Sequence, residues 1–168
     1  MKNILEDAII NYHYYEETTS TQELAKESLS RLELGEYYVI SAGSQTEGIG
    51  TNNNQWISPK GNIYMSIAFI ANKNQKIHLM QYVATLTVSN LLQKLAIHSN
   101  IKWPNDVLIG GKKVAGVLAQ SFTNVSNVNE DTIGICLGIG LNVNCSQKEI
   151  DSYKLNATSI LIENNTRQ

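Results

Sequence analysis

Residues 101–120 read IKWPNDVLIGGKKVAGVLAQ and carry the strongest local structural signal of the chain. Within them, the apolar runs 107–109 and 114–119 flank the pair Gly110 and Gly111. A two-residue glycine loop between apolar runs predicts a β-hairpin, because the primed turns of hairpins need positive φ angles. The stretch therefore predicts two antiparallel strands joined by a tight turn.

The expected register of this hairpin gathers charged residues on one face. Counted from the turn, Leu108 pairs with Lys113 and Asp106 pairs with Ala115, so these four residues share a face. Asp106 and Lys113 are then diagonal neighbours, about 7–8 Å apart at the backbone and within side-chain reach. Gly116 faces the opposite way from Lys113. A carboxylate beside an ammonium suits a site for an anion and a metal; the alternative is that the lysines are solvated charges beside the turn.

The composition narrows the class of protein. The 168 residues suffice for one domain with a core, and the net charge of −2 provides no basic field for nucleic acid. Cys136 and Cys145 are the two cysteines, and their spacing suggests neither a disulfide framework nor a metal site. We find neither a signal peptide nor an apolar run of about 20 residues, so we expect a cytoplasmic protein with no membrane contact.

The rest of the chain alternates between strand and helix patterns, which indicates an α+β class. The expected strands are 12–16, 37–42, 62–70 and 132–143, and the expected helices are 20–35, 77–95 and a turn within 146–154. Ser20 followed by Glu23 is typical of a capping box at the start of the first helix. In the longest helix, Leu79, Val83 and Leu86 recur at helical spacing, so we expect this side to pack on the sheet.

Three motifs together resemble the catalytic domain of biotin–protein ligases. They are KWPND at 102–106, GKKVAGVL at 111–118 and GIGLNVN at 138–144. The resemblance covers roughly residues 14–160. It implies a mixed β-sheet backed by helices, similar to class II aminoacyl-tRNA synthetases, within the biotin/lipoate ligase superfamily. It also leads us to expect a single catalytic domain over residues 1–168, with neither an N-terminal helix-turn-helix nor a small C-terminal β-barrel.

The resemblance implies a reaction in two steps. The carboxylate of biotin attacks the α-phosphate of MgATP, which gives biotinyl-AMP and pyrophosphate. A lysine of a biotin carboxyl carrier protein, or of that domain in a carboxylase, then takes the biotinyl group. The family includes monomers and homodimers, so either state is expected.

Residue roles follow from the positions that match the family motifs. Lys113 is the expected catalytic cation, which contacts the biotin carboxylate and the α-phosphate. The expected biotin-binding residues are Ser20, Thr21, Gln45, Gly48, Gly50, Lys113 and Gly116. The expected ATP-binding residues are Trp56, Lys102, Asn105, Asp106 and Asn142, and Asp106 is also the expected Mg²⁺ ligand.

One segment departs from the family pattern. Residues 48–54 read GIGTNNN where the ligases carry Gly-Arg-Gly-Arg-Arg-Gly-Arg, so every arginine of the adenylate loop is replaced. Arginine gives bidentate, charge-assisted hydrogen bonds to anions, and the neutral donors of Thr and Asn are weaker. Two alternatives to an active ligase therefore remain. One is a degenerate relative that binds biotin or the acceptor protein without catalysis, and the other is a lipoate or octanoate ligase or transferase.

Overall fold

The computed structural model describes residues 8–74, 76 and 79–165. Within them the elements are β1 (Ile9–Tyr15), α1 (Thr21–Ser28), η1 (Leu29–Arg31), β2 (Glu36–Ala42), η2 (Thr51–Asn53), β3 (Ile63–Asn72), α2 (Met80–Lys94), β4 (Asn100–Lys102), β5 (Asp106–Ile109), β6 (Lys112–Phe122), β7 (Thr132–Leu141), α3 (Gln147–Ser152) and α4 (Ile160–Asn165). The first two residues of the helix predicted over 77–95 lie outside the described residues.

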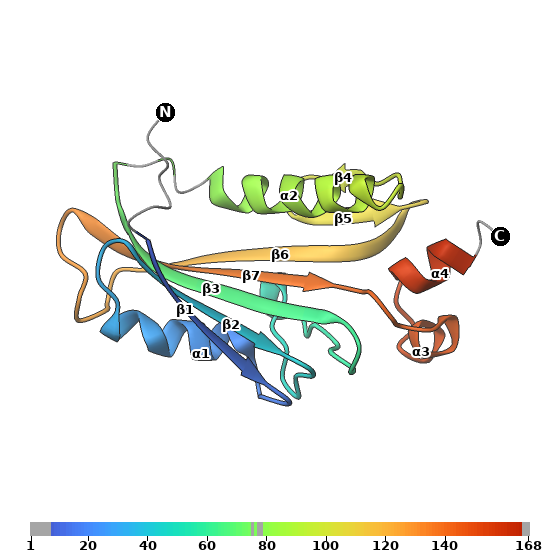
Figure 1. Cartoon of the computed structure of the whole chain (residues 1–168), viewed down its shortest axis with the longest axis horizontal. Helices are drawn as coiled ribbons and strands as arrows, with labels where there is room; N and C mark the ends of the chain where they lie inside the picture. The colour runs from blue at the N-terminus through green and yellow to red at the C-terminus, as the bar shows by residue number, and fades with distance from the viewer. Residues whose placement is uncertain (1–7, 75, 77–78, 166–168) are drawn as a thin grey trace.

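One seven-stranded sheet organises these elements, in the order β1-β2-β3-β7-β6-β5-β4. β1 runs parallel to β2, and every other neighbouring pair is antiparallel. Helix α1 lies on one face of this sheet and α2 on the other, while α3 and α4 gather at one end (Figure 1). The prediction of an α+β fold with a mixed sheet backed by helices is confirmed.

Helix α1 begins at the residue that the sequence indicated. Ser20 is the N-cap, and its side chain accepts a hydrogen bond from the backbone N of Gln22 at 3.3 Å. The predicted capping box is wrong, because Glu23 turns instead toward Lys26, 3.9 Å away. The helix also ends before Gly35, at Ser28, and continues as the short 3₁₀ turn η1.

The predicted hairpin is present, and its turn follows the sequence signal. Residues 110–111 have φ angles of +55° and +82°, as the primed turn requires. Next to the turn, Leu108 pairs with Lys113 as expected. Further along, Val107 pairs with Ala115, so the register shifts by one residue.

This shift is a β-bulge, and it changes which residues share a face. Val114 is the extra residue, so Asp106 pairs with Gly116 and the predicted pairing with Ala115 is wrong. A Cβ at Gly116 would lie 3.1 Å from Lys113 Nζ, which shows that the two residues face the same side. The expectation that Gly116 faces away from Lys113 is therefore also wrong.

Helix α2 packs on the sheet through a different side from the one predicted. Val83 and Leu86 are 59% and 51% exposed, whereas Ala84, Val88 and Leu92 are buried. The prediction failed because apolar residues occur on both sides of this helix, which carries no charge before its last residue. No helix within the described ranges is both long and apolar enough to cross a membrane.

Candidate active site

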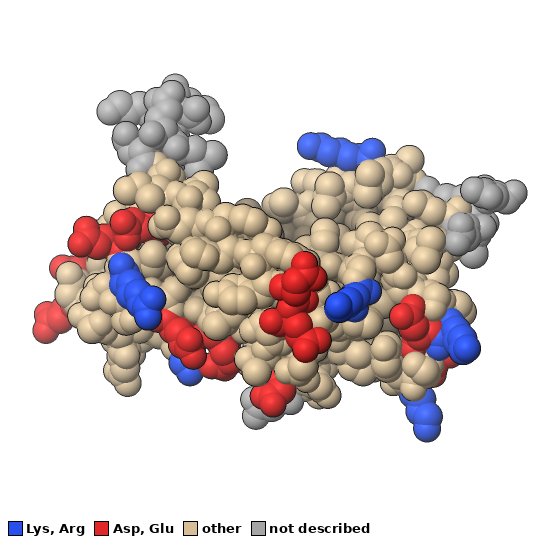
Figure 2. All heavy atoms as spheres, turned by 60° about the horizontal axis from the view of Figure 1, so that its bottom comes forward, with Lys and Arg blue, Asp and Glu red and all other residues tan. Residues whose placement is uncertain are grey.

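A pocket opens on the α1 face of the sheet, between the start of α1, the loop 43–58 and strands β3, β6 and β7. Eight residues predicted to bind ligand line it: Ser20, Thr21, Gln45, Gly50, Trp56, Asn105, Lys113 and Gly116. Figure 2 shows part of the surrounding surface, where acidic and basic side chains are scattered and no continuous basic area is visible.

Hydrogen bonds join the start of α1 to the loop and to the sheet. Gln45 Oε1 accepts from Thr21 N at 2.8 Å, and Gln45 Nε2 donates to Ser58 Oγ at 2.8 Å. Ser58 Oγ in turn donates to the Trp56 carbonyl at 2.8 Å. Thr21 Oγ1 lies 2.9 Å from Ser66 Oγ on β3. This network fixes one end of the pocket before any ligand binds.

An ion pair lies at the other end of the pocket. Lys113 Nζ is 2.6 Å from Asp106 Oδ1, and the two side chains are 31% and 19% exposed. This oxygen has no hydrogen-bond partner among the described residues beyond the Lys113 ammonium. Lys113 Nζ also lies 5.0 Å from the centroid of the Trp56 ring, within the range of a cation–π interaction. The prediction that Asp106 and Lys113 lie within reach of each other is confirmed.

The main chain of Lys113 is held from the C-terminal part of the chain. Its N–H donates to the Asn156 carbonyl at 3.1 Å, and its carbonyl accepts from Thr158 N at 2.9 Å. Strand β7 ends at Leu141, opposite Ala115, so residues 156–158 pair with β6 where β7 no longer does. This pairing fixes the backbone from which the lysine projects.

Trp56 lies flat on a floor of glycines. Gly116 of β6 and Gly140 of β7 are paired across the two strands. A Cβ at Gly140 would lie 2.5 Å from Trp56 Cε2, and one at Gly116 would lie 2.9 Å from Trp56 Cζ3. Only bare backbone leaves room for the ring here. The indole Nε1 is buried without a hydrogen-bond partner among the described residues, which makes it a free donor at the floor of the pocket.

The loop 43–58 supplies no cation to the pocket. It contains neither Arg nor Lys, so Lys113 is the only positively charged side chain among the described residues that line the pocket. Thr51 reaches the pocket at the position of a replaced arginine. Gly48 lies outside the lining, and a Cβ there would overlap the Trp56 carbonyl oxygen. Its glycine is therefore explained by the close fold of the loop itself.

Three residues predicted to bind the nucleotide lie outside the pocket lining, and one of them, Asp106, is linked to it through its contact with Lys113. Lys102 is exposed at the end of β4 and does not line the pocket. Asn142 also lies outside the lining, and its Nδ2 donates to the Thr158 carbonyl at 3.0 Å. In this structure Asn142 therefore holds the C-terminal segment that supports Lys113.

Several pocket residues were missing from the predicted set. Gln22 and Ser66 line the end near α1, and Gly138 and Gly140 form part of the floor. The two glycines carried a signal, because glycine inside a strand often marks a close approach. Ser66 carried none, since a serine on a buried strand face is recognised only once its partners are known.

Tyr64 lines the pocket as a neutral side chain. Its hydroxyl donates to the Pro59 carbonyl at 2.7 Å. Burial raises the pKa of the Tyr64 phenol well above its ordinary value, so the group stays protonated at any physiological pH. It acts there as a fixed donor in the protein.

The residues present fit a metal only together with a ligand. Among the described residues, no group of three or more His, Cys, Asp and Glu side chains is placed to hold a metal ion. Asp106 is a single carboxylate, and its Oδ1 already contacts the Lys113 ammonium. Mg²⁺ is often bound by one or two carboxylates with phosphate and water oxygens completing its shell. Asp106 therefore fits a Mg²⁺ site that a nucleotide would complete.

Residues 14–142 match the model of the Biotin/lipoate A/B protein ligase family. The chain belongs to this family.

Individual relatives agree with that assignment. The chain is 33% identical over 153 residues to the bifunctional ligase/repressor BirA of Bacillus subtilis, and the aligned segment covers 88% of this chain and 45% of the relative. It is 31% identical over 136 residues to the chloroplastic biotin–protein ligase 1 of Arabidopsis thaliana, with 77% and 35% coverage. The chain thus spans less than half the length of these relatives.

Solved structures show the same fold. The biotin protein ligase of Aquifex aeolicus in complex with biotin and ATP superposes with a TM-score of 0.65 at 30% identity, covering 92% of this chain and 61% of that one. The ligase of Leishmania major in complex with biotinyl-5-AMP superposes with a TM-score of 0.70 at 26% identity, with 92% and 65% coverage.

Proposed function

We propose that this chain is the catalytic part of an ATP-dependent biotin–protein ligase. The observation that carries the proposal is the pocket itself. Its one cation, Lys113, is paired with Asp106 at one end, and Ser20, Thr21 and Gln45 form a hydrogen-bonding end opposite. The similarity to ligases whose structures hold biotin and ATP supports the same substrates here.

Lys113 is the residue that stabilises charge in the proposed reaction. A carboxylate oxygen of biotin attacks the α-phosphorus of ATP, the bond to the β-phosphate breaks, and pyrophosphate leaves. Negative charge builds up between carboxylate and phosphate, where the Lys113 ammonium acts as a preorganised partner. Asp106 holds this ammonium in place and supplies one oxygen toward Mg²⁺, which neutralises phosphate charge when bound.

In the second step the amine of an acceptor lysine attacks the carbonyl of the mixed anhydride. The bond between carbonyl carbon and phosphate oxygen breaks, AMP leaves, and an amide forms. The acceptor is a biotin carboxyl carrier protein or domain, as expected for the family. The catalytic unit acts as a monomer or as a homodimer in this proposal.

The replaced arginines shape how the phosphates are bound. Without them, the adenylate is held by Lys113, by the Thr51 hydroxyl and by backbone N–H groups near Gly50. We therefore expect weaker nucleotide binding than an arginine-containing loop gives. The same replacement motivates the second candidate, a relative that binds biotin without activating it.

The experiment that tests the proposal is ATP–pyrophosphate exchange by the purified chain with Mg²⁺, with biotin, octanoate or lipoate supplied separately. Exchange that depends on biotin supports the ligase. Biotin binding without exchange supports the non-catalytic relative and contradicts the ligase. Exchange that depends on octanoate or lipoate, but not on biotin, would assign the chain to the lipoate branch of the family.

A further inference from the structure

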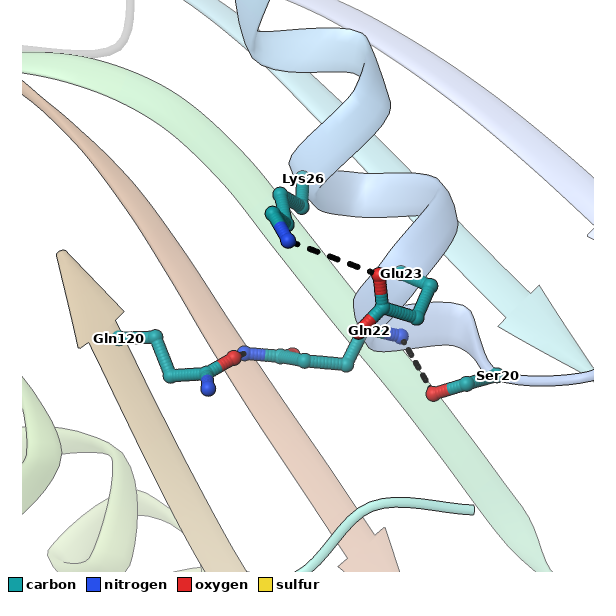
Figure 3. Close-up of polar contacts among 5 residues, drawn as sticks. All are labelled: Ser20, Gln22, Glu23, Lys26 and Gln120. Atoms are coloured by element: carbon teal, nitrogen blue, oxygen red, sulfur yellow. Dashed lines mark hydrogen bonds and ion pairs between the residues drawn. The ribbon is translucent and has the colours of Figure 1, made fainter. Parts of the chain in front are cut away.

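One side chain in the wall of the pocket has most of its hydrogen-bonding capacity used by the protein. Gln22 is buried, and its side chain extends from α1 across the sheet to Gln120 of β6 (Figure 3). Its Nε2 donates to Gln120 Oε1 at 3.0 Å and to the Cys136 carbonyl at 3.3 Å. Its Oε1 accepts from Ser66 Oγ at 2.9 Å. Because a carbonyl only accepts, the Cys136 contact also fixes which end of the amide points toward β7.

Besides making these hydrogen bonds, the amide of Gln22 packs against a glycine. A Cβ at Gly138 would lie 2.6 Å from Gln22 Oε1, so the amide occupies the space that any other residue at 138 would fill. Displacing it would leave buried donors and acceptors without partners, which is unfavourable. The amide is therefore a fixed part of the wall that does not yield to a ligand.

The Gln22 amide lines the end of the pocket near α1, away from Lys113, so it can limit which substrates fit. In the proposed function the reacting carboxylate lies at Lys113, so the far end of the acid meets the wall at Ser20, Thr21 and Gln22. Hydrogen bonds from three strands hold this wall in one shape. It accepts a head group that fits against it and excludes a larger one.

We propose that Gln22 determines the size of the acid's head group, and that Gln120 and Ser66 act as positioning residues that hold its amide on Gly138. This inference rests on the proposed function and deepens it. It assigns a specificity role to Gln22, which was absent from the residues predicted to bind biotin.

The test compares two acids on the full chain. Dissociation constants for biotin, and for biotin methylated on one ureido nitrogen, are measured by calorimetry without ATP. The wild-type chain should prefer biotin by a factor of about 10–200, the range that one methyl or methylene group gives in a well-fitted pocket. Gln22→Asn shortens the side chain by one methylene and withdraws the amide from Gly138. The preference should then fall at least fivefold, while Gln93→Asn on the exposed side of α2 leaves it unchanged.

Two variants test whether the Gln22 amide packs against Gly138. Gly138→Ala alone places a methyl group where Gln22 Oε1 lies, so the melting temperature and the biotin affinity should both fall. Adding Gln22→Ala removes the clash, and the double variant should melt several degrees above Gly138→Ala. A melting temperature of the double variant below that of both single variants would contradict this packing of Gln22 against Gly138.

The ratio of the two affinities separates a specificity role from a structural one, because loss of stability alone would not change it. If Gln22→Asn does not fold, Gln120→Ala is used instead, which removes one of the three hydrogen bonds of the amide without changing α1, and a smaller fall in the preference is expected. Biotin binding with an unchanged ratio overturns this inference and leaves the proposed function standing. If the wild-type chain binds neither acid, the proposed function is overturned and this inference with it.

Discussion

At the scale of single residues, the main feature is that Lys113 and Asp106 neutralise each other before a ligand arrives. Their 2.6 Å contact is only partly exposed, so an incoming carboxylate competes with Asp106 for the ammonium. The contact with Asp106 fixes the direction in which the Lys113 side chain points. Ligand binding then redistributes contacts around the lysine and needs no new charge.

The role of Lys113 can be tested against its neighbour in the chain. Lys113→Ala removes the one cation of the pocket and should lower kcat/KM for biotin-dependent exchange by about 10²–10³, the loss typical of one preorganised donor. Lys112→Ala is the matched control, because Lys112 is exposed next to the turn and outside the pocket lining. Equal effects of the two substitutions on exchange would contradict the assignment.

The fit between Trp56 and the glycine floor gives a second prediction. Gly140→Ala introduces a Cβ that would lie 2.5 Å from Trp56 Cε2, so the indole has to move. In a Trp103→Phe background, which removes the exposed second tryptophan, the emission maximum of Trp56 should shift to longer wavelength. The free energy of unfolding should fall by about 1–3 kcal/mol, as for other overpacked sites. An unchanged emission spectrum would show that the ring does not lie on this floor.

At the scale of elements, some features of the hairpin could be predicted from its sequence and others could not. The turn at 110–111 and the nearness of Asp106 to Lys113 follow from local pattern, because turn type and strand period fix both. The bulge at Val114 does not follow from local pattern, because it depends on the segments that pair with the edge of β6 opposite β5. There the partner changes from residues 156–158 to β7, and neither partner is near in sequence.

Helix α2 was also predicted only in part from its sequence. Its existence was predicted from periodicity, but its buried side was not, because apolar residues occur around most of its circumference. The buried side can be tested by substituting one leucine on each side of the helix. Leu92→Ala, at a fully buried position, should lower the free energy of unfolding by about 2–5 kcal/mol.

The matched substitution is Leu86→Ala, at a position that is 51% exposed. It should change the free energy of unfolding by no more than about 0.5 kcal/mol. Urea denaturation of both variants gives the comparison. A larger loss for Leu86 than for Leu92 would mean that the helix packs through the side first predicted from the sequence.

At the scale of the whole molecule, buried protonated groups set the response to alkaline pH. Burial raises the pKa of the Cys136 thiol to about 12, and burial also raises the pKa of Cys145 and Tyr64. For a raised pKa, the stabilising effect is complete below the unfolded value. Above it the unfolded chain loses protons that the folded chain keeps, so stability falls with rising pH.

We therefore expect the free energy of unfolding to decrease above pH 9, by about 1 kcal/mol per pH unit from Cys136 alone. Urea denaturation between pH 8 and pH 10.5 measures this slope. Cys136→Ala should reduce the slope without removing it, because Cys145 and Tyr64 remain. A stability that rises over this range would contradict the assignment.

The sequence predicted most of the whole-molecule architecture through its resemblance to one family, and local patterns predicted most strands and helices. The pocket was predicted less completely. Ser20, Thr21, Gln45 and Lys113 were found by motif, whereas the wall at Gln22 depends on hydrogen bonds to strands far along the chain. Such contacts leave no trace in local spacing, so only the folded chain reveals them.

The pairing of Lys113 with residues 156–158 bears on when this site becomes usable during synthesis. Ribosomes make the chain from its N-terminus, so the lysine emerges more than 40 residues before the backbone partners Asn156 and Thr158. Until those partners are available, the Lys113 N–H and carbonyl lack the two hydrogen bonds that they make in the folded chain. A nascent chain can therefore form much of its sheet early and still hold Lys113 loosely, and a translation product that stops before residue 156 would lack these two hydrogen bonds.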